Sequence, residues 1–528
     1  MKALDLSAGF ESGQEYRFEG ERLHVFGKDT VHLTDPVYRS IYPSEKTWLD
    51  TAVYLHGLSD VVLDFGGAVL TLHDDTIQPF VLHDCQNVTI RNVTVEYERS
   101  MMDEMDVADV RDGELWLRQT EKQKKYFPIK AEDGRLIPVS GDKEYKHDFE
   151  EPHFLNFYDK KTRMASLMCL VRIGKDLRVI PHEEFPFSYC ELTAEQRGEY
   201  IVLQGDLPAG IPIGSVAAQT HSARDISSCL LIGCRNVRLE NYRILNGAGM
   251  GILGMYSENI TLDRLLLQFD ERSHGFASNA ADAVHLFSCF GRVELLNSVL
   301  EGMKDDALNI HGNYYCVDSA EGNVIHARLK TDIQKDPALN AHCRMFGAGD
   351  RIAVYQGSTM IERQNCIVQR AEVTGDFTAD LYVSGDVSSL REGDTVENLS
   401  AQADLHIESC RFGKAKTHLR LQTRGKILLE NCECALKILL SGDKNYWYEG
   451  SPVTDLTIQN CTFVGKNARI EAVPEFTATP EFPWYHSGIR VVGNVFDAET
   501  ALHLSGCRDV VFENNVHRRG RSFKNVIR

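Results

Sequence analysis

Three aspartates carry the clearest chemical signal in the sequence. Asp305 and Asp306 are adjacent in the segment KDDALNIHG (304–312), just before a short run in which apolar residues alternate. Asp282 precedes a matching run, because ADAVHL (281–286) aligns with DDALNI (305–310) at an offset of 24 positions. Carboxylates held close together repel one another, which raises the pKa of one and leaves another ionised. The pattern predicts an acid/base set of the kind that hydrolyses glycosidic bonds.

The same segments carry polar residues suited to hydrogen bonding with sugar hydroxyls. His285 and Asn309 occupy equivalent positions of the two runs, and His311 follows shortly after Asn309. The loop QFDERSHGFASNAAD (268–282) adds Arg272 and His274 as residues that could reach a ligand. Each has a structural interpretation too: Asp before a strand is a common turn residue, a lone histidine packs in a core, and a charged loop is solvated.

Two tryptophans and two glutamates are weaker candidates. Trp447 in NYWYEG and Trp484 in FPWYHSG are placed for stacking on a sugar ring, or for capping an apolar interior. Glu271 and Glu362 are further carboxylates that a loop or an insertion could bring to the site.

Short strands in a repeat must position these side chains. One phrase recurs ten times, beginning with HGLSDVVLDFGG (56–67), DCQNVTIRNVTV (84–95) and GCRNVRLENYRI (233–244). Each copy has a turn residue, alternating aliphatic residues, a second turn residue and another short strand, and copies follow roughly 22 to 33 residues apart, which predicts one coil of a parallel β-helix per repeat. A β-propeller would need blades of about 40 to 50 residues. Neighbouring coils lie about 4.8 Å apart, so Asp282 should stack on or near Asp306.

Two stretches interrupt the repeat and divide the chain. Residues 98–220 and 314–401 contain strand-like runs bounded by Gly and Asp, which predicts small inserted all-β barrels or sandwiches. The β-helix itself is then expected in three parts: first coils at 1–97, central catalytic coils at 221–313, and C-terminal coils at 402–528.

Composition excludes some classes of partner. Asp and Glu number 76 against 57 Lys and Arg, a net charge of −19, which argues against a nucleic-acid or anionic membrane partner. The sequence has no long apolar run and no apolar export segment near Met1, so we expect a cytoplasmic protein without a membrane anchor. The 14 cysteines form no C-x-x-C pair and stand near the ends of short strands, which predicts reduced thiols in the core.

A family resemblance follows from the segments around the aspartates. The matching features are G-x-G-I-L at 249–253, S-x-x-A-D-A-x-H at 278–285, C-x-G at 289–291 and E-G-x-x-D-D-A-x-N-x-H-G at 301–312. In these features the chain resembles glycoside hydrolase family 110, the bacterial exo-α-1,3-galactosidases, and the resemblance extends more weakly over most of the sequence.

The resemblance implies a right-handed parallel β-helix enzyme that removes terminal α-1,3-linked galactose with inversion and without a metal or other cofactor. It places the general acid at Asp282 and the base side at Asp305 with Asp306. The implied partner is a galactose-terminated oligosaccharide, with a homodimer as one expectation for the assembly. Three alternatives remain open: a polygalacturonase-like hydrolase, a β-helix lyase or epimerase that uses Ca²⁺, and a non-catalytic glycan-binding solenoid.

Overall fold

The computed structural model describes most of the 528 residues. They are 9–18, 20–34, 48–140, 153–175, 177, 188–220, 226–272, 275–329, 346–375, 378–413, 418–444 and 447–528, with the backbone of two short strands at 2–3 and 143–144. Within them there is no helix long and apolar enough to cross a membrane.

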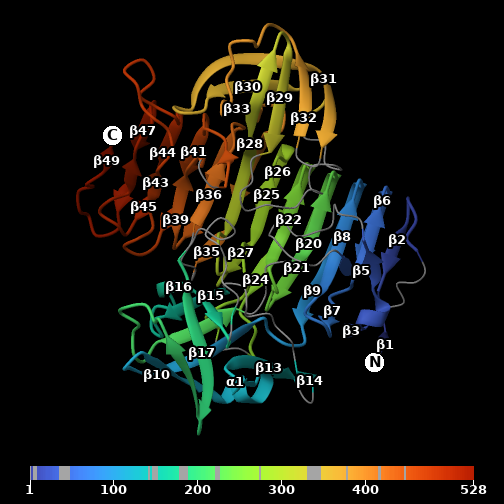
Figure 1. The fold of residues 1–528 in the computed structure, drawn as a ribbon, viewed down its shortest axis with the longest axis vertical. Coiled ribbons are helices and arrows are strands. Elements are labelled where there is room, and N and C mark those ends of the chain that lie inside the picture. The colour runs from blue at the N-terminus through green and yellow to red at the C-terminus, as the bar shows by residue number, and fades with distance from the viewer. Residues whose placement is uncertain are drawn as a thin grey trace.

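The chain winds into stacked coils, each of which contributes a strand to three parallel sheet faces (Figure 1). The first face contains β6 (Ser59–Asp64), β9 (Gln86–Tyr97), β21 (Arg235–Leu245), β23 (Glu258–Asp263), β26 (Phe290–Leu296), β34 (Ala403–Glu408), β37 (Ile427–Glu430), β41 (Leu456–Gln459), β44 (Ile489–Val492) and β47 (Val510–Glu513).

The second face contains the later residues of β9 and β21 with β7 (Val69–Leu72), β24 (Leu266–Gln268), β27 (Val299–Glu301), β35 (Arg411–Gly413), β38 (Glu433–Cys434), β42 (Thr462–Phe463), β45 (Val495–Phe496) and β48 (Val516–His517). The third face, which carries the aspartates, contains β5 (Leu49–His56), β8 (Ile77–His83), β20 (Ser227–Ile232), β22 (Met250–Met255), β25 (Val284–Phe287), the start of β28 (Leu308–Glu321), β36 (His418–Gln422), β39 (Lys437–Leu440), β43 (Ile470–Ala472), β46 (Leu502–Leu504) and β49 (Val526–Ile527).

Alternating sequence explains why the coils stack in one register. Val88 pairs with Val237, and Val237 pairs with Ile260, so that inward aliphatic side chains lie above one another in successive coils. All three are fully buried or nearly so. A slip of one residue would turn these side chains to solvent, so burial of the aliphatic rows fixes the register. The predicted all-β, parallel β-helix fold is confirmed.

The recurrent turn asparagines form a ladder along one edge of the stack. Asn236 donates to Asn87 at 2.8 Å and accepts from Asn259 at 2.9 Å. All three have positive φ, between 54° and 58°, a region that asparagine tolerates better than most other residues. Asparagine therefore serves both the turn conformation and the link between coils.

Replacing Asn236 separates these two contributions. We expect Asn236→Ala to lower the free energy of unfolding by about 1–2 kcal/mol, because alanine strains at positive φ and makes no side-chain hydrogen bond. Asn236→Gly should cost less, since glycine accepts the turn conformation. Urea denaturation of the two variants measures the difference, and equal losses would contradict a contribution from backbone strain.

Cysteines occupy a second, buried ladder near the C-terminal coils. The Sγ atom of Cys432 accepts from the backbone N–H of Cys410, and that of Cys461 accepts from the backbone N–H of Cys432. None of the described cysteines forms a disulfide, and most of them are buried. Ten of the 13 described cysteines are buried, as predicted for core-facing thiols, whereas Cys169, Cys190 and Cys507 are partly exposed; Cys343 lies outside the described residues.

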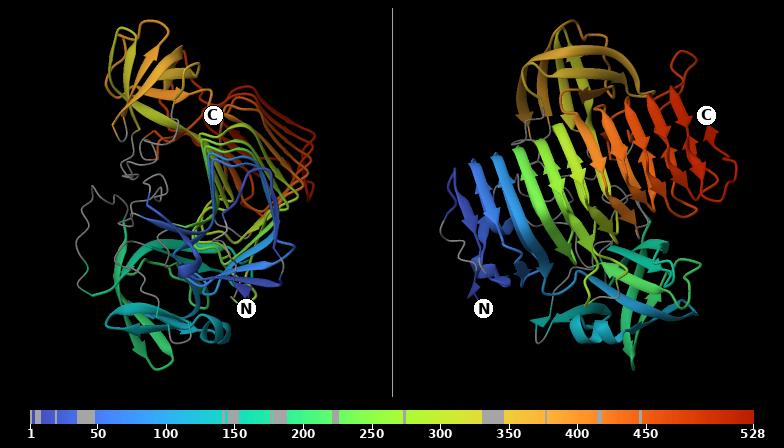
Figure 2. Two further views of the ribbon diagram at one scale, coloured as in Figure 1. Left: turned by 90° about the vertical axis from the view of Figure 1, so that its right-hand side faces the viewer. Right: turned by 180° about the vertical axis from the view of Figure 1, so that it is seen from behind.

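Two all-β insertions extend from the coils on the same side of the stack (Figure 2). In the first, a closed barrel has the strand order β10 (Met102–Arg111), β11 (Glu114–Gln119), β18 (Tyr200–Gly205), β17 (Cys190–Arg197), β16 (Ala165–Ile173), β15 (His153–Tyr158) and β19 (Val216–Thr220). A six-residue helix, α1 (Glu121–Tyr126), follows β11.

The second insertion grows directly out of a coil strand. Residues Leu308–His311 of β28 pair with the β-helix strand β36, whereas Tyr315–Glu321 of the same strand pair with β29 (Val324–Leu329). Further antiparallel pairings through β32 (Thr378–Val383), β31 (Ile361–Gly375), β30 (Arg351–Gln356) and β33 (Thr395–Asn398) return to β28 and close the ring. The expected pair of inserted all-β units is confirmed.

Candidate active site

The three aspartates meet on the third face where β25 and β28 begin. In the parallel register His285 lies opposite Asn309, and Phe287 lies opposite His311. The predicted equivalence of His285 and Asn309 is confirmed, and the same offset places Asp282 opposite Asp306. The backbone N–H of Asp306 donates to Oδ1 of Asp282 at 3.0 Å, which links the two turns directly.

Asp306 is a buried, paired carboxylate. Its Oδ2 accepts from Nε of Arg420 at 3.0 Å, and its Oδ1 accepts from the backbone N–H of His418 at 3.0 Å. Burial opposes ionisation of Asp306, but Arg420 and His418 together hold its pKa below the usual value. Asp306 is therefore an ionised group whose oxygens are both engaged by protein donors.

Asp282 has the opposite electrostatic character. It is 4% exposed, and burial, with the negative charge of Asp305 next in importance, raises its pKa to about 6 despite a hydrogen bond from His285. That bond joins Oδ2 of Asp282 to Nδ1 of His285 at 2.7 Å. A carboxyl group with a pKa near 6 is able to donate a proton near neutral pH, as a general acid must.

Asp305 is the most exposed of the three, although still half-buried. One carboxylate oxygen from each of Asp282, Asp305 and Asp306 lies within 4.8 Å of the others. The two neighbours in sequence therefore differ in environment, Asp306 being fixed against Arg420 while Asp305 remains reachable. The cluster combines a carboxyl group with a raised pKa, a carboxylate paired with Arg420, and a more accessible aspartate.

Glu449 joins this site from a distant loop, and sequence reasoning missed it. It lies on β40 (Glu449–Gly450), which pairs antiparallel with β28 at Asn313. Its Oε1 is 3.7 Å from Nε2 of His311, and its Oε2 accepts from Asn309 at 3.3 Å. In the NYWYEG segment Trp447 is a candidate for sugar stacking, but an isolated glutamate there carries no motif.

The first inserted barrel anchors the segments that carry the aspartates. Nζ of Lys304 donates to the carbonyl oxygens of Phe154 and Ala218 at 3.0 and 2.9 Å. Oε1 of Glu104 accepts from the backbone N–H groups of Phe276 and Ala277 at 3.0 and 2.8 Å. These contacts hold the loop before Asp282 and the turn before Asp305 against the barrel.

Arg272, predicted as a residue that could reach a ligand, contacts other residues of the protein. The Arg272 guanidinium contacts Asp270 and donates to the carbonyl oxygens of Tyr97 and Glu98, which ties the loop to a neighbouring coil. His274 lies outside the described residues.

The weaker candidates, two glutamates and two tryptophans, differ in their environments. Glu271 is exposed, and its carbonyl oxygen accepts from Lys122. Glu362 pairs with Arg424 at 3.4 Å, and the Trp484 ring is covered by Arg508 at 4.6 Å. Trp447 is partly buried in the loop that supplies Glu449.

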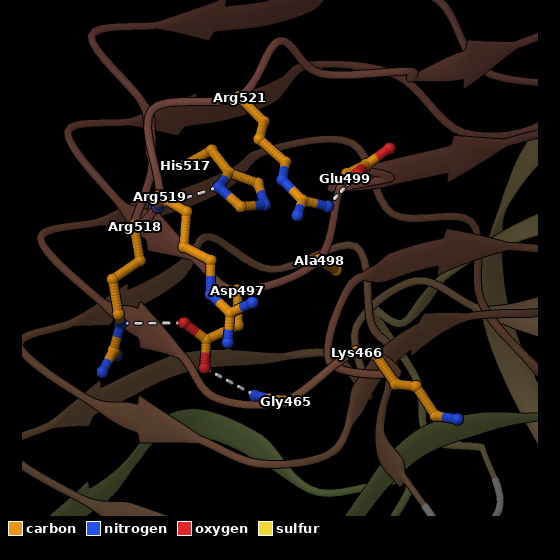
Figure 3. Close-up of a pocket in the computed structure, with 9 residues that line it drawn as sticks. All are labelled: Gly465, Lys466, Asp497, Ala498, Glu499, His517, Arg518, Arg519 and Arg521. Atoms are coloured by element: carbon orange, nitrogen blue, oxygen red, sulfur yellow. Dashed lines mark hydrogen bonds and ion pairs between the residues drawn. The ribbon is translucent and has the colours of Figure 1, made fainter.

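A pocket of about 570 Å³ lies on the last coils, around β45 and β48 (Figure 3). Its lining is rich in arginine, but Arg518 pairs with Asp497 and Arg521 pairs with Glu499. None of the three aspartates lines it. The pocket therefore adds nothing to the chemistry of the aspartate cluster.

Two groups of side chains are compact enough to be tested as metal sites: the three aspartates, and His285 with His311 and Glu449. Among the aspartates, Arg420 already pairs with Asp306, so the anionic oxygen shell that Ca²⁺ prefers is incomplete. The Nε2 atoms of His285 and His311 are 3.0 Å apart, shorter than the roughly 3.3 Å between two nitrogens on one tetrahedral zinc. Neither group fits a metal well.

Curated relatives with one activity in their names match most of the chain. Alpha-1,3-galactosidase B of Bacteroides thetaiotaomicron is 26% identical over 471 residues, which cover 84% of this chain and 71% of the relative. Alpha-1,3-galactosidase A of Shewanella woodyi is 24% identical over 470 residues, covering 86% and 73%. Alpha-1,3-galactosidase A of Bacteroides thetaiotaomicron is 25% identical over 453 residues, covering 84% and 72%. No family model matches the chain.

Solved structures give more distant matches. The family 28 exopolygalacturonase of Yersinia enterocolitica aligns with a TM-score of 0.32 and 10% identity, covering 96% of this chain and 70% of that one. The receptor-binding domain of the siphovirus 9NA tailspike aligns with a TM-score of 0.20 and 9% identity, covering 100% and 76%. The sequence similarity to the curated relatives, over most of the chain, supports a glycoside hydrolase.

Proposed function

We propose that the protein is an exo-acting α-1,3-galactosidase of the family 110 type, which hydrolyses terminal galactose from oligosaccharides. The observation that carries the proposal is Asp282, a buried carboxyl with a raised pKa beside the more accessible Asp305. A pair of carboxyl groups in different protonation states is the requirement of glycoside hydrolysis. The relatives named alpha-1,3-galactosidase support the choice of sugar and linkage.

In this proposal Asp282 is the general acid and Asp305 the general base. As the bond between C1 and the glycosidic oxygen breaks, that oxygen takes the proton of Asp282. Water forms the new bond to C1 and gives a proton to Asp305. The products are free galactose and a shortened oligosaccharide, and the proton gained by Asp305 balances the one lost by Asp282.

Asp306 has a positioning role here rather than a share in the base. Its oxygens are held by Arg420 and by the backbone of His418, so it has little capacity to activate water. Its backbone N–H instead orients Oδ1 of Asp282. His285, Asn309 and His311 line the same site as candidates for contact with the sugar or with the acids.

Stereochemistry depends on where the attacking water is held. Carboxyl groups of inverting enzymes usually stand about 6.5–9.5 Å apart, and those of retaining enzymes about 5 Å apart. Oxygens of Asp282 and Asp305 approach within 4.8 Å, so a water that attacks with inversion has to be held by Asp305 outside the gap between the two groups. We propose inversion with the water in that position.

The test is release of galactose from an α-1,3-linked galactosyl disaccharide, followed by NMR of the anomer formed first. β-Galactose as the first product is expected. α-Galactose would replace inversion with retention and make Asp305 a nucleophile. A folded protein that releases no galactose from this substrate, or from α-1,4- and α-1,6-linked controls, would contradict the galactosidase assignment.

A further inference from the structure

His285 and His311 face each other with their Nε2 atoms. Nδ1 of His285 contacts the Asp282 carboxylate, and Nδ1 of His311 contacts the Gly312 carbonyl oxygen at 2.8 Å. A carbonyl oxygen only accepts, so His311 has its hydrogen on Nδ1, and the carboxylate favours the same tautomer in His285. In two neutral rings the Nε2 lone pairs would then oppose each other at 3.0 Å, unless a hydrogen lies between them.

We propose that one additional proton bridges His285 and His311, and that these histidines with Glu449 are positioning residues which keep a proton available to Asp282. This inference rests on the proposed function of Asp282 as general acid. The bridging proton makes the His285 ring cationic, with Nδ1–H donating to Asp282 and Nε2–H donating to His311. His311 remains neutral, and its Nδ1–H donates to the carbonyl oxygen of Gly312.

The surrounding charges favour this arrangement. Burial opposes the charge on His285, but the hydrogen bond and charge of Asp282 raise its pKa, with Glu449 adding to the effect. Burial lowers the pKa of His311 to about 4, so the cation belongs on the His285 side. The charged groups that act on the pair are Asp282 before β25, Asp306 before β28, Arg420 on β36 and Glu449 on β40, and Asp305 acts on Asp282.

Glu449 lies next to His311, at the opposite end of the series from Asp282. It is 8% exposed, and burial works against its ionisation, yet His311, Arg420 and His285 hold its pKa below the usual value. Asn309 and Gln422 donate to its Oε2 at 3.3 and 3.4 Å. A buried negative charge fixed at this point attracts the bridging proton, which explains why the site keeps a carboxylate so far along the sequence from the aspartates.

The bridge gives Asp282 a source of protons inside the protein. In the resting state Asp282 is ionised beside the cationic His285, so the proton that the leaving oxygen needs is held on the ring. The Nδ1 proton of His285 moves to Asp282, which passes it to the leaving oxygen, and a proton from solvent restores the cation after product release. No oxidant, metal or further reactant enters this sequence, because only protons change place.

The first measurement is a pH titration by NMR of protein labelled with ¹⁵N in histidine, with His311→Gln used to assign the pair. We expect His285 to stay cationic above the pH at which an ordinary histidine deprotonates. In Glu449→Gln the midpoint should fall by about one pH unit, because a nearby negative charge is lost. Glu471→Gln is the matched control: Glu471 pairs with Lys437 and Arg469, and its loss should leave the His285 midpoint in place.

The second measurement is the pH profile of kcat/KM for galactose release. The alkaline limb of Glu449→Gln should move to lower pH by about one unit, a shift that is read from the shape of the profile whatever the height of its plateau. A purely structural role would lower activity at every pH. Glu449→Asp should restore the limb in part, and His311→Gln, which accepts but cannot carry the proton, should also shift it.

Three results would overturn the proposal: two neutral imidazoles throughout the titration, a midpoint insensitive to Glu449→Gln, or one equivalent of zinc whose removal separates the two rings. The titration reads the bridge without substrate, so it still decides the inference if the protein releases no galactose. A protein that releases no galactose would contradict the proposed function alone. If Glu449→Gln does not fold, the His311→Gln titration decides the same question.

Discussion

Asp282→Asn should lower kcat/KM for an α-1,3-galactosyl disaccharide by about 10³- to 10⁴-fold, because asparagine cannot protonate the departing sugar. The same variant should lose less than about tenfold on 2,4-dinitrophenyl α-galactoside, whose leaving group needs no proton. For wild type, activity on the disaccharide should fall as pH rises and the proton shared by Asp282 and His285 is lost, because burial raises the pKa of Asp282 and Asp282 in turn raises that of His285. That alkaline limb should be absent with the dinitrophenyl substrate.

Asp305→Asn provides the contrast that separates acid from base. A base activates water for every substrate, so this variant should be equally impaired on the disaccharide and on the dinitrophenyl galactoside. Equal losses in Asp282→Asn on both substrates would contradict its role as general acid. If the two variants exchange these behaviours, the roles of the two aspartates are reversed.

Arg420→Met should lower the free energy of unfolding by about 3–5 kcal/mol at neutral pH, the usual effect of removing one partner of a buried ion pair. Arg420 contacts Asp306 at 3.0 Å, and the carboxylate is 3% exposed, so the variant leaves a buried charge without its counter-ion. Urea denaturation followed by circular dichroism measures the loss. Disruption of Asp306 should also displace the turn that orients Asp282.

The pH dependence identifies the cause of that loss. In wild type Asp306 has a lowered pKa, so its contribution is present above the unfolded value, about 3.9, and is lost as pH falls through the folded value. In Arg420→Met burial raises that pKa, so the deficit should shrink at acidic pH, where Asp306 becomes neutral.

Two controls accompany the arginine variant. Asp306→Asn combined with Arg420→Met should recover much of the stability, because no charge remains unpaired. Arg17→Met removes an ion pair with Glu15 in which both side chains are exposed, and it should cost less than about 1 kcal/mol. A loss in Arg420→Met that is independent of pH would contradict the electrostatic explanation.

The sequence determined the coils because their signals are local. Each repeat combines a period of two in its aliphatic residues with an asparagine or glycine that accepts a positive φ, as at Asn236 and Asn259. Stacking of such units buries one continuous core, so the architecture follows from any few copies. The offset between Asp282 and Asp306 was readable for the same reason, since it equals the length of one coil.

The tertiary structure alone decided the surroundings of each aspartate. Asp305 and Asp306 are indistinguishable as neighbours in a sequence, but Arg420 and His418, which bind only Asp306, lie on a coil more than one hundred residues later. The second insertion separates those segments, and Glu449 is later still. Protonation states depend on charge and burial within a few ångströms in space, and sequence distance does not report that separation. The chain thus specified which carboxylates would meet, and the packing of distant coils set the direction in which the pKa values of Asp282 and Asp306 shift.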